Sequence, residues 1–198
     1  MKSCPLFPLR TVLFPYGKLS LRIFEPRYLE MVSERLKSDQ PFGVVSIREG
    51  NEAGKAATFH KFGTLATIVD FDQQSDGLLG LTCTGGSRFQ VLDHHVSDSQ
   101  LISASVQLVQ ERHGEIESDE DRRALEDVSK VLKVILENEG MREYRKTLTE
   151  RWGDPSWVVF QVAEILPIGP DVRQSILEMS LKERLWLIRR MIEANEQG

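Results

Sequence analysis

Residues 21–29 have the sequence LRIFEPRYL, in which a predicted strand passes directly into a predicted helix. The strand is indicated by Leu19, Leu21 and Ile23, which alternate with polar residues and would share one buried face. Pro26 lacks an N–H and is tolerated in the first turn of a helix, so the helix is expected to begin there. We expect the rest of the chain to be arranged around this corner.

The same nine residues predict how the corner is held together. Glu25 precedes the proline and is expected to cap the helix, at the positive end of the helix dipole. Phe24 and Leu29 have the spacing of a hydrophobic staple, in which two apolar side chains pack against each other. If Phe24 is fully buried, its replacement by alanine costs about 3–5 kcal/mol of stability. We interpret the corner as a packing feature without chemistry of its own.

The composition is that of a soluble globular protein. The 198 residues, 40% of them hydrophobic, suffice for one good core or for a large and a small domain. The net charge of −5 gives no general attraction to nucleic acid or to an anionic membrane. No apolar run approaches the roughly 18 residues of a membrane-spanning helix. Cys4 and Cys83 are isolated thiols, and the N-terminus has no signal-peptide core, so we expect a cytoplasmic protein with free cysteines.

The sequence changes character at Arg112. Before it, short predicted strands follow one another through glycine-containing turns, which is typical of a small antiparallel barrel or sandwich. After it, apolar residues recur at helical spacing, and Ser180 with Glu183 forms a capping box for the last helix. We therefore expect an α+β fold with a β-rich part, residues 1–112, and a helical part, residues 113–198.

Several segments, taken together, resemble a known family. Each is short, but their order and spacing along the chain are specific: PLFPL at 5–9, LRIFEPRYL at 21–29, FGVV at 42–45, FGTLA at 62–66, GSRFQVL at 86–92 and LEMSLKERL at 177–185. They resemble the N-terminal, substrate-binding domain of Lon-type ATP-dependent proteases over nearly the whole chain. The resemblance implies a PUA-like antiparallel β-barrel or sheet followed by a C-terminal helical bundle.

The resemblance also implies a function. It indicates a non-enzymatic module that binds unfolded or exposed hydrophobic protein segments, with a protease or a chaperone as a further kind of partner. The sequence shows no Walker-type glycine-rich loop and no counterpart of the Ser-Lys protease domain, so we expect a stand-alone binding protein without a cofactor. The alternative is binding of RNA or a nucleotide through a PUA-like fold. The charge of −5 and the lack of a basic stripe argue against nucleic acid.

Neither a metal site nor a hydrolase is indicated by the residues. His94 and His95 are adjacent, so in a strand their side chains point to opposite faces and do not share a metal ion. No Gly-x-Ser-x-Gly nucleophile motif occurs in the sequence. A hydrolase of another kind would need a nucleophile and a base within hydrogen-bond reach, and no such pair is indicated.

The candidate peptide-binding residues are aromatic and basic side chains near predicted strand ends and loops: Phe7, Phe14, Tyr16, Arg22, Arg27, Tyr28, Arg88 and Trp152. The rings would offer a shallow surface to an extended peptide, and unpaired strand edges would add backbone hydrogen bonds. In the competing interpretation each ring packs in the core and the arginines pair with Glu25 or Glu30. The sequence leaves both interpretations open.

Overall fold

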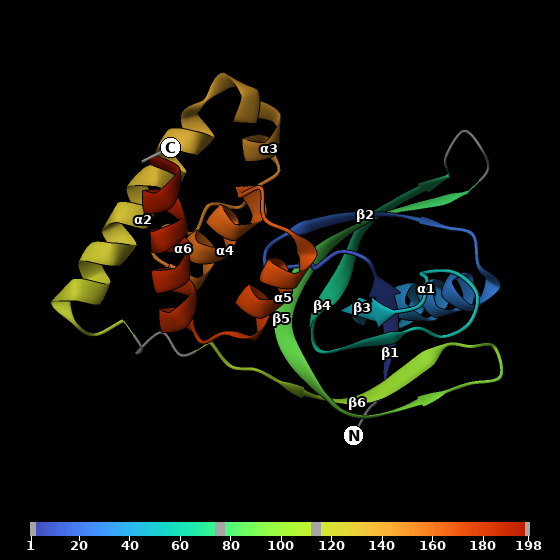
Figure 1. Cartoon of the computed structure of the whole chain (residues 1–198). Helices are drawn as coiled ribbons and strands as arrows, with labels where there is room; N and C mark the ends of the chain where they lie inside the picture. Colours follow the sequence, from blue (N-terminus) through green and yellow to red (C-terminus); the bar gives the residue numbers. More distant parts are fainter. Residues whose placement is uncertain (1–2, 74–77, 112–115, 197–198) are drawn as a thin grey trace. The chain divides into compact units, whose positions relative to one another are not determined.

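The computed structural model describes residues 3–73, 78–111 and 116–196 (Figure 1). The first part of the chain forms a sheet and one helix: β1 (Cys4–Leu9), β2 (Lys18–Ile23), α1 (Pro26–Ser38), β3 (Phe42–Glu49), β4 (Thr58–Gln73), β5 (Leu79–Val96) and β6 (Ile102–Leu108). The later part is helical: α2 (Asp119–Glu137), the short 3-10 helix η2 (Glu139–Met141), α3 (Arg142–Lys146), α4 (Pro155–Ile165), α5 (Pro170–Glu178) and α6 (Leu181–Glu196). The expected α+β class is confirmed.

The chain divides into two compact units. The first contains residues 1–110 and 169–177, and the second contains residues 111–168 and 178–198. Most of α5 therefore belongs to the unit that carries the sheet. The expected boundary between residues 112 and 113 lies outside the described residues, and a division into two separate domains stays a prediction.

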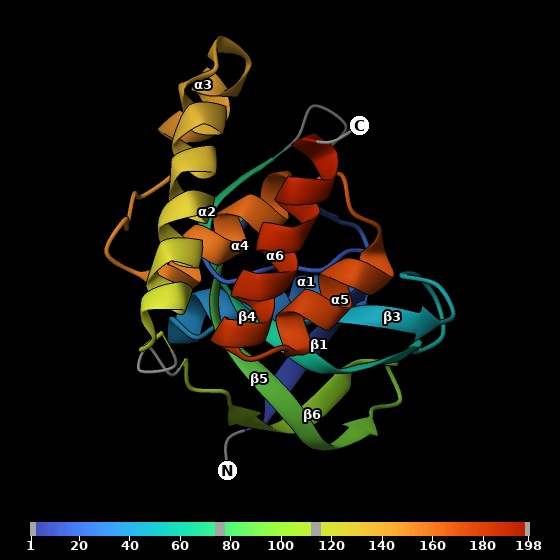
Figure 2. The same ribbon diagram turned by 60° about the vertical axis from the view of Figure 1, so that its left-hand side comes forward.

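The sheet closes on itself without using all of its strands. Its six strands have the order β2-β5-β4-β3-β1-β6, and β5 also pairs with β6. The strands β5, β4, β3, β1 and β6 thus form a ring, with β5 and β6 side by side in both ribbon views (Figures 1 and 2). β1 and β3 are parallel, while the other pairs are antiparallel.

The length of β5 explains how β2 joins this ring. The first part of β5, Leu79–Thr84, pairs with β2, whereas its second part, Phe89–Val96, pairs with β6. Since β6 also pairs with the start of β1, the ring is complete without β2. β2 is therefore an additional strand attached to one side of β5.

The interior of the ring is filled around Phe89, which is fully buried. Glycine is required where two strands pass this ring closely. A Cβ atom at Gly43 or Gly63 would lie 2.8 or 2.7 Å from the ring of Phe89, closer than two carbon atoms approach. The two glycines give the aromatic side chain its space, so they belong to the packing of the barrel rather than to a turn.

Helix α5 packs on the strands of the first unit. The guanidinium of Arg88 in β5 donates a hydrogen bond of 2.5 Å to the carbonyl of Leu177. The side-chain amide of Gln174 donates to the carbonyl of Phe62 in β4 at 3.3 Å. The guanidinium of Arg173 lies 4.8 Å from the ring centre of Phe14. These contacts join residues that are 89 to 159 positions apart in the chain.

The corner between β2 and α1 is where the sequence placed it. α1 begins with Pro26, and Glu25 is the cap residue. Its carboxylate makes no capping hydrogen bond. Instead it pairs with the guanidinium of Arg27 at 3.0 Å and accepts the backbone N–H of Gly54 at 3.2 Å.

The predicted hydrophobic staple is wrong. Phe24 is 59% exposed and Leu29 is 39% exposed. The reason is the alternation of β2 itself: Ile23 points into the core, so the next residue of the extended chain points away from it. On α1 the buried positions are Arg27 and Tyr28, with Met31 and Val32 in the next turn, which leaves Leu29 at the border of the buried face.

In the second unit α2, α4 and α6 lie side by side (Figure 2). α4 is buried along almost its whole length and supplies Trp157 and Phe160 to the core. The guanidinium of Arg184 in α6 is fully buried, pairs with the carboxylate of Glu111 and lies 4.1 Å from the ring centre of Phe160. A charge this deep in the core is tolerated because a carboxylate and an aromatic face accompany it.

Asp121 links the start of α2 to α6. Its carboxylate accepts hydrogen bonds from Lys182 Nζ at 2.8 Å, from the Ser118 hydroxyl at 2.7 Å and from Trp186 Nε1 at 2.9 Å. These three donors, led by Lys182, hold the pKa of the Asp121 carboxyl well below its ordinary value. At the start of α6 the predicted capping box is present, since Glu183 accepts the backbone N–H of Ser180 at 2.8 Å.

We predict that Asp121→Asn lowers the free energy of unfolding by about 2 kcal/mol at neutral pH, because it removes the charge that three donors share. The lowered pKa of Asp121 also means that the unfolded state binds this proton first as the pH falls. The contribution of Asp121 is therefore complete at neutral pH and is lost progressively below about pH 5. Urea unfolding between neutral and acidic pH measures both effects. Asp119→Asn, in the same helical turn but 87% exposed, is the control and is expected to change little.

We predict that Phe24→Ala changes the free energy of unfolding by no more than about 0.5 kcal/mol, because the ring is largely exposed. Ile23→Ala, one position earlier and buried, is expected to cost about 2–5 kcal/mol. Denaturant unfolding of the two variants beside the parent protein makes the comparison. Equal losses for the two variants would contradict the exposed position of Phe24.

Candidate functional site

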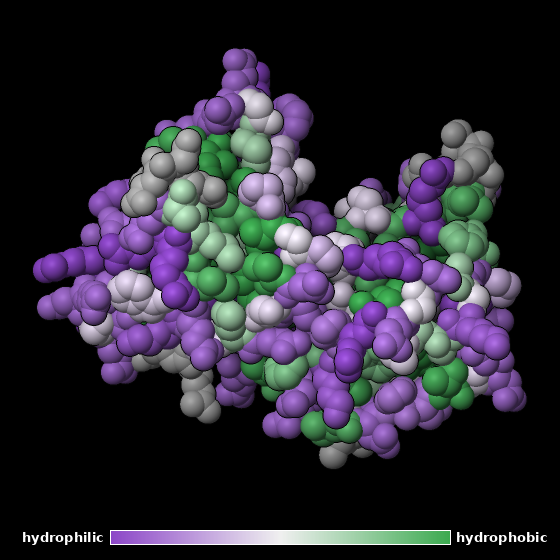
Figure 3. Space-filling model, viewed as in Figure 1, coloured by the Kyte–Doolittle hydropathy of each residue, from purple (hydrophilic) through white to green (hydrophobic). Residues whose placement is uncertain are grey.

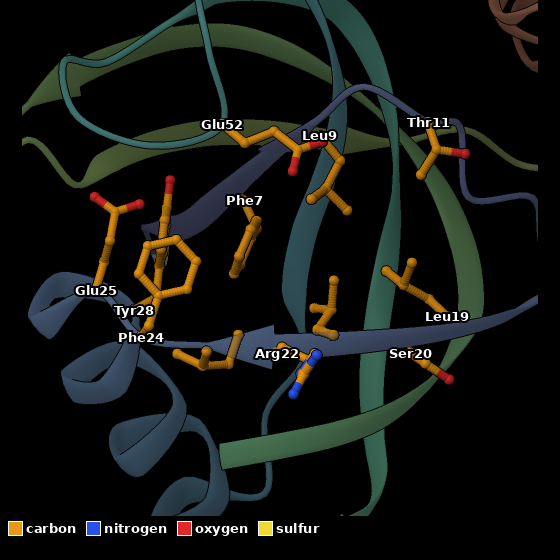
Figure 4. Close-up of a pocket in the computed structure, with 12 residues that line it drawn as sticks. Phe7, Leu9, Thr11, Leu19, Ser20, Arg22, Phe24, Glu25, Tyr28 and Glu52 are labelled. Carbon is orange, nitrogen blue, oxygen red and sulfur yellow. The ribbon is translucent and has the colours of Figure 1, made fainter. Parts of the chain in front are cut away.

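A groove of about 390 Å³ lies between β1 and β2 in the first unit (Figure 4). Its walls are largely apolar. It is lined by Phe7, Leu9, Thr11 and Glu52 on one side, by the continuous run 19–25 on the other, and by Tyr28 at the end near α1. On the face of the first unit that carries β2, hydrophobic residues show between hydrophilic ones (Figure 3).

The groove is bordered by the edge of β2 rather than by one of its faces. Successive residues of a strand point to opposite faces of the sheet. Here Leu19, Leu21 and Ile23 line the groove, and so do Ser20 and Arg22 between them. Residues from both faces reach the same cavity only along the strand's edge. Within the described part of the chain β2 pairs with β5 alone and stands at the end of the strand order, so this edge has no partner strand.

The opposite wall comes from β1. β1 pairs with β3 from Leu6 to Leu9, but with β6 only from Cys4 to Leu6. Among the described strands, residues 7–9 therefore have a neighbour on one side only. In this wall the ring of Phe7 stacks on that of Tyr28, with ring centres 4.0 Å apart and planes at 16°. The stack joins β1 to the first turn of α1 and forms one end of the groove.

Phe24 is the aromatic side chain most open to a ligand here. It lines the groove and is 59% exposed, whereas Phe7 and Tyr28 are 6% and 5% exposed. Covering an exposed aromatic ring with a ligand is favourable, because the ligand removes hydrophobic area of the ring from water. The sequence did not indicate Phe24 as a binding residue, because its spacing from Leu29 suggested a staple. The alternation of β2 was the signal that places it outside the core.

Two acidic residues line the groove. Glu25 lies at its end near α1, as does Tyr28, and Glu52 lies beside Leu9. Burial raises the pKa of the Tyr28 hydroxyl to about 12; the neighbouring Arg27 lowers it, while Glu25 and Glu52 raise it further. The phenol therefore keeps its proton at neutral pH and remains a hydrogen-bond donor.

Glu25 and Glu52 differ in how their charges are compensated. Glu25 pairs with the guanidinium of Arg27 at 3.0 Å. Glu52 accepts the backbone N–H of Arg10 at 2.7 Å, and it forms no ion pair with any residue that the structure describes. The carboxylate of Glu52 thus presents a negative charge at the rim of the groove.

Of the residues predicted from the sequence, Phe7, Arg22 and Tyr28 line the groove. Arg27 lies directly beside the groove and is buried. Its guanidinium donates a hydrogen bond of 2.8 Å to the carbonyl of Gln100 and lies 4.6 Å from the ring centre of Tyr28. Whether these residues bind a peptide stays a prediction.

The other predicted residues do not reach the groove. Phe14 and Arg88 are buried where α5 packs on the strands. Tyr16 has a left-handed backbone, with φ of 66°, and donates its N–H to the carbonyl of Gly85 at 2.7 Å. Trp152 belongs to the second unit, where its ring meets that of Trp157 edge-on at 5.1 Å and its indole N–H donates to Glu150 at 2.7 Å.

Residues 3–73, 78–111 and 116–196 contain neither a cluster of metal ligands nor a membrane-spanning helix. No three His, Cys, Asp or Glu residues in these ranges come together as metal ligands would. The same ranges contain no helix with the length and apolar character needed to cross a bilayer. Both cysteines are buried as free thiols, and burial raises the pKa of Cys4 and Cys83 to about 11, so neither is an activated nucleophile.

Comparison with known proteins confirms the family resemblance. The family of the ATP-dependent protease La (LON) substrate-binding domain matches residues 3–194. The Lon protease of Flavobacterium johnsoniae is 26% identical over 186 residues, which is 92% of this chain. The Lon protease of Anaeromyxobacter dehalogenans is 25% identical over 198 residues, or 98% of the chain. The chain spans 23% of the length of each of these two relatives.

Solved structures share the fold. A Lon N-terminal domain protein from Xanthomonas campestris aligns with a TM-score of 0.76 at 29% identity, covering 95% of this chain and 97% of that one. The N-terminal domain of the Mycobacterium avium complex Lon protease aligns with a TM-score of 0.70 at 17% identity, covering 94% and 96% of the two chains. The second likeness concerns the fold alone.

We predict that Tyr28 titrates later than an ordinary tyrosine, since its pKa is raised to about 12. Because the folded state keeps the proton longer than the unfolded state, the contribution of Tyr28 to stability is lost as the pH rises from about 10 towards 12. Ultraviolet absorbance of tyrosinate follows the titration, and Tyr28→Phe should remove a step near pH 12. Tyr16→Phe and Tyr144→Phe, which leave Tyr28 in place, are the controls. An unchanged titration near pH 12 in Tyr28→Phe would contradict the assignment.

Proposed function

The chain belongs to the family of the ATP-dependent protease La (LON) substrate-binding domain, and from that premise we propose that it holds exposed hydrophobic segments of unfolded proteins in the groove between β1 and β2. The observation that carries the proposal is an apolar cavity of about 390 Å³ with the exposed ring of Phe24 at its rim. Burying this surface under an apolar segment is favourable, and it needs no particular sequence in the partner.

The groove is suited to binding without hydrolysis. Its lining includes the hydroxyl groups of Thr11 and Ser20, but no histidine, lysine or cysteine among its described residues. A hydroxyl acts as a nucleophile only when a base takes its proton. The two carboxylates in the lining have partners of their own: Glu25 pairs with Arg27, and Glu52 accepts the backbone N–H of Arg10. We therefore assign the groove to recognition and propose that a protease or a chaperone acts on what it holds.

Binding is tested with a fluorescently labelled, reduced and carboxymethylated model protein that cannot fold. Its addition to the full chain should give a saturable anisotropy change with a micromolar Kd, and the native form of the same model protein should give none.

We predict that Phe24→Ala weakens this binding by about tenfold, the equivalent of ~1.4 kcal/mol, because the ring supplies apolar area that the ligand covers. Phe71→Ala is the matched control: Phe71 is 57% exposed on β4 and does not line the groove. Circular dichroism confirms that both variants are folded. Equal losses for the two variants, or no binding by the folded parent protein, would contradict the proposal.

A further inference from the structure

We propose that the segment held in the groove adds to the sheet as an extended strand along the edge of β2, with a basic residue beside Glu52. This inference rests on the proposed function and names the class of segment that it accepts. Three features of the first unit support it: the state of the β2 edge, the separation of polar and apolar side chains along the groove, and the negative charge of Glu52.

The β2 edge is ready for a further strand. All six residues of β2 pair with β5 in one continuous register, from Lys18 with Thr84 to Ile23 with Leu79. Neither a proline nor a shift in register interrupts the strand. In an antiparallel pair, alternate residues direct their N–H and C=O groups away from the partner strand. β2 therefore presents a regular row of donors and acceptors to the groove, and an extended peptide satisfies such a row whatever its sequence.

The two walls determine the pattern of side chains in the added strand. β1 runs antiparallel to β2, as follows from the chain of pairings through β3, β4 and β5. On the core side of the groove lie apolar residues of both strands, including Phe7, Leu9 and Leu21. On the other face β2 carries Ser20 and Arg22, both exposed. A strand between these walls directs every second side chain towards the core, so it should alternate apolar and polar residues.

The charge of Glu52 determines which polar residues are favoured in the bound strand. Glu25 is already neutralised by Arg27, but the carboxylate of Glu52 is engaged only by a backbone N–H in the described structure. This exposed carboxylate lies beside Leu9, on the β1 side of the groove. A lysine or arginine of the bound strand is attracted where it passes this carboxylate, whereas an acidic residue is repelled.

The backbone part of the proposal is tested with an eight-residue peptide that alternates apolar and polar residues and ends in lysine on both sides. Two further peptides carry N-methyl groups on alternate residues, one in each register. We expect one N-methylated peptide to bind the full chain at least about tenfold more weakly than the other, because only one set of N–H groups faces β2. Bound parent peptide should also slow amide hydrogen exchange at alternate residues of β2.

The charge part uses the same peptide with glutamate in place of both lysines. We expect the lysine form to bind about fivefold more tightly, as for an exposed ion pair, and the preference to fade with added salt. Glu52→Gln should reduce the preference to about twofold or less. Glu34→Gln, which removes the same charge from an exposed position of α1 outside the groove, should leave it unchanged.

The outcomes separate this inference from the function on which it rests. If the unfolded model protein and the peptides all fail to bind the folded chain, the proposed function fails. If they bind and Phe24→Ala weakens them, but both N-methylated peptides bind like the parent peptide, strand addition is overturned and the groove still binds. Equal binding of the lysine and glutamate peptides overturns the selection by Glu52.

Discussion

The buried guanidinium of Arg27 is the interaction on which the groove depends. It pairs with Glu25 at 3.0 Å, donates to the carbonyl of Gln100 at 2.8 Å and lies against the ring of Tyr28. These partners belong to the corner between β2 and α1 and to the turn before β6. A charge removed from water is stable only when such partners are held in place, so the guanidinium and its partners fix one another. The ring of Phe7 stacks on that of Tyr28, so the same contacts also hold β1, the other wall of the groove, in position.

The sequence was sufficient where one local rule governs the structure. The start of α1 at Pro26 follows from the chemistry of proline, and the capping box of Ser180 and Glu183 follows from the hydrogen bonds that each side chain can make. The staple of Phe24 and Leu29 obeys the spacing rule as well, yet it does not form. The spacing of two residues shows only that their side chains are able to make contact. Ile23 and Tyr28 are buried in the core of the unit, and their burial turns the neighbouring Phe24 and Leu29 away from it.

The candidate site was only partly predictable for the same reason. Aromatic and basic residues near strand ends include Phe7, Arg22 and Tyr28, which line the groove, but also Phe14 and Arg88, which do not. The last two are covered by α5, whose residues Arg173 and Leu177 lie far along the chain. No local pattern around Phe14 or Arg88 reports that a distant helix will pack there. In the same way, the groove needs the order of the strands, and one sequence without its pairings does not supply that order.

The free edge of β2 is a consequence of the topology rather than of a single loop. β5 has 18 residues and serves two neighbours, β2 along its first part and β6 along its second. Because β6 pairs with β1, the ring closes, and among the described strands β2 is left with β5 as its one partner. Unpaired edges normally invite aggregation, and charged side chains on the strand are one way in which proteins limit it. Lys18 and Arg22 are exposed on β2 and protect the strand against such aggregation, whereas its apolar side chains face the core. An edge that is protected on its outer face and lies open along the groove fits the proposal that an extended segment adds to the sheet at this place.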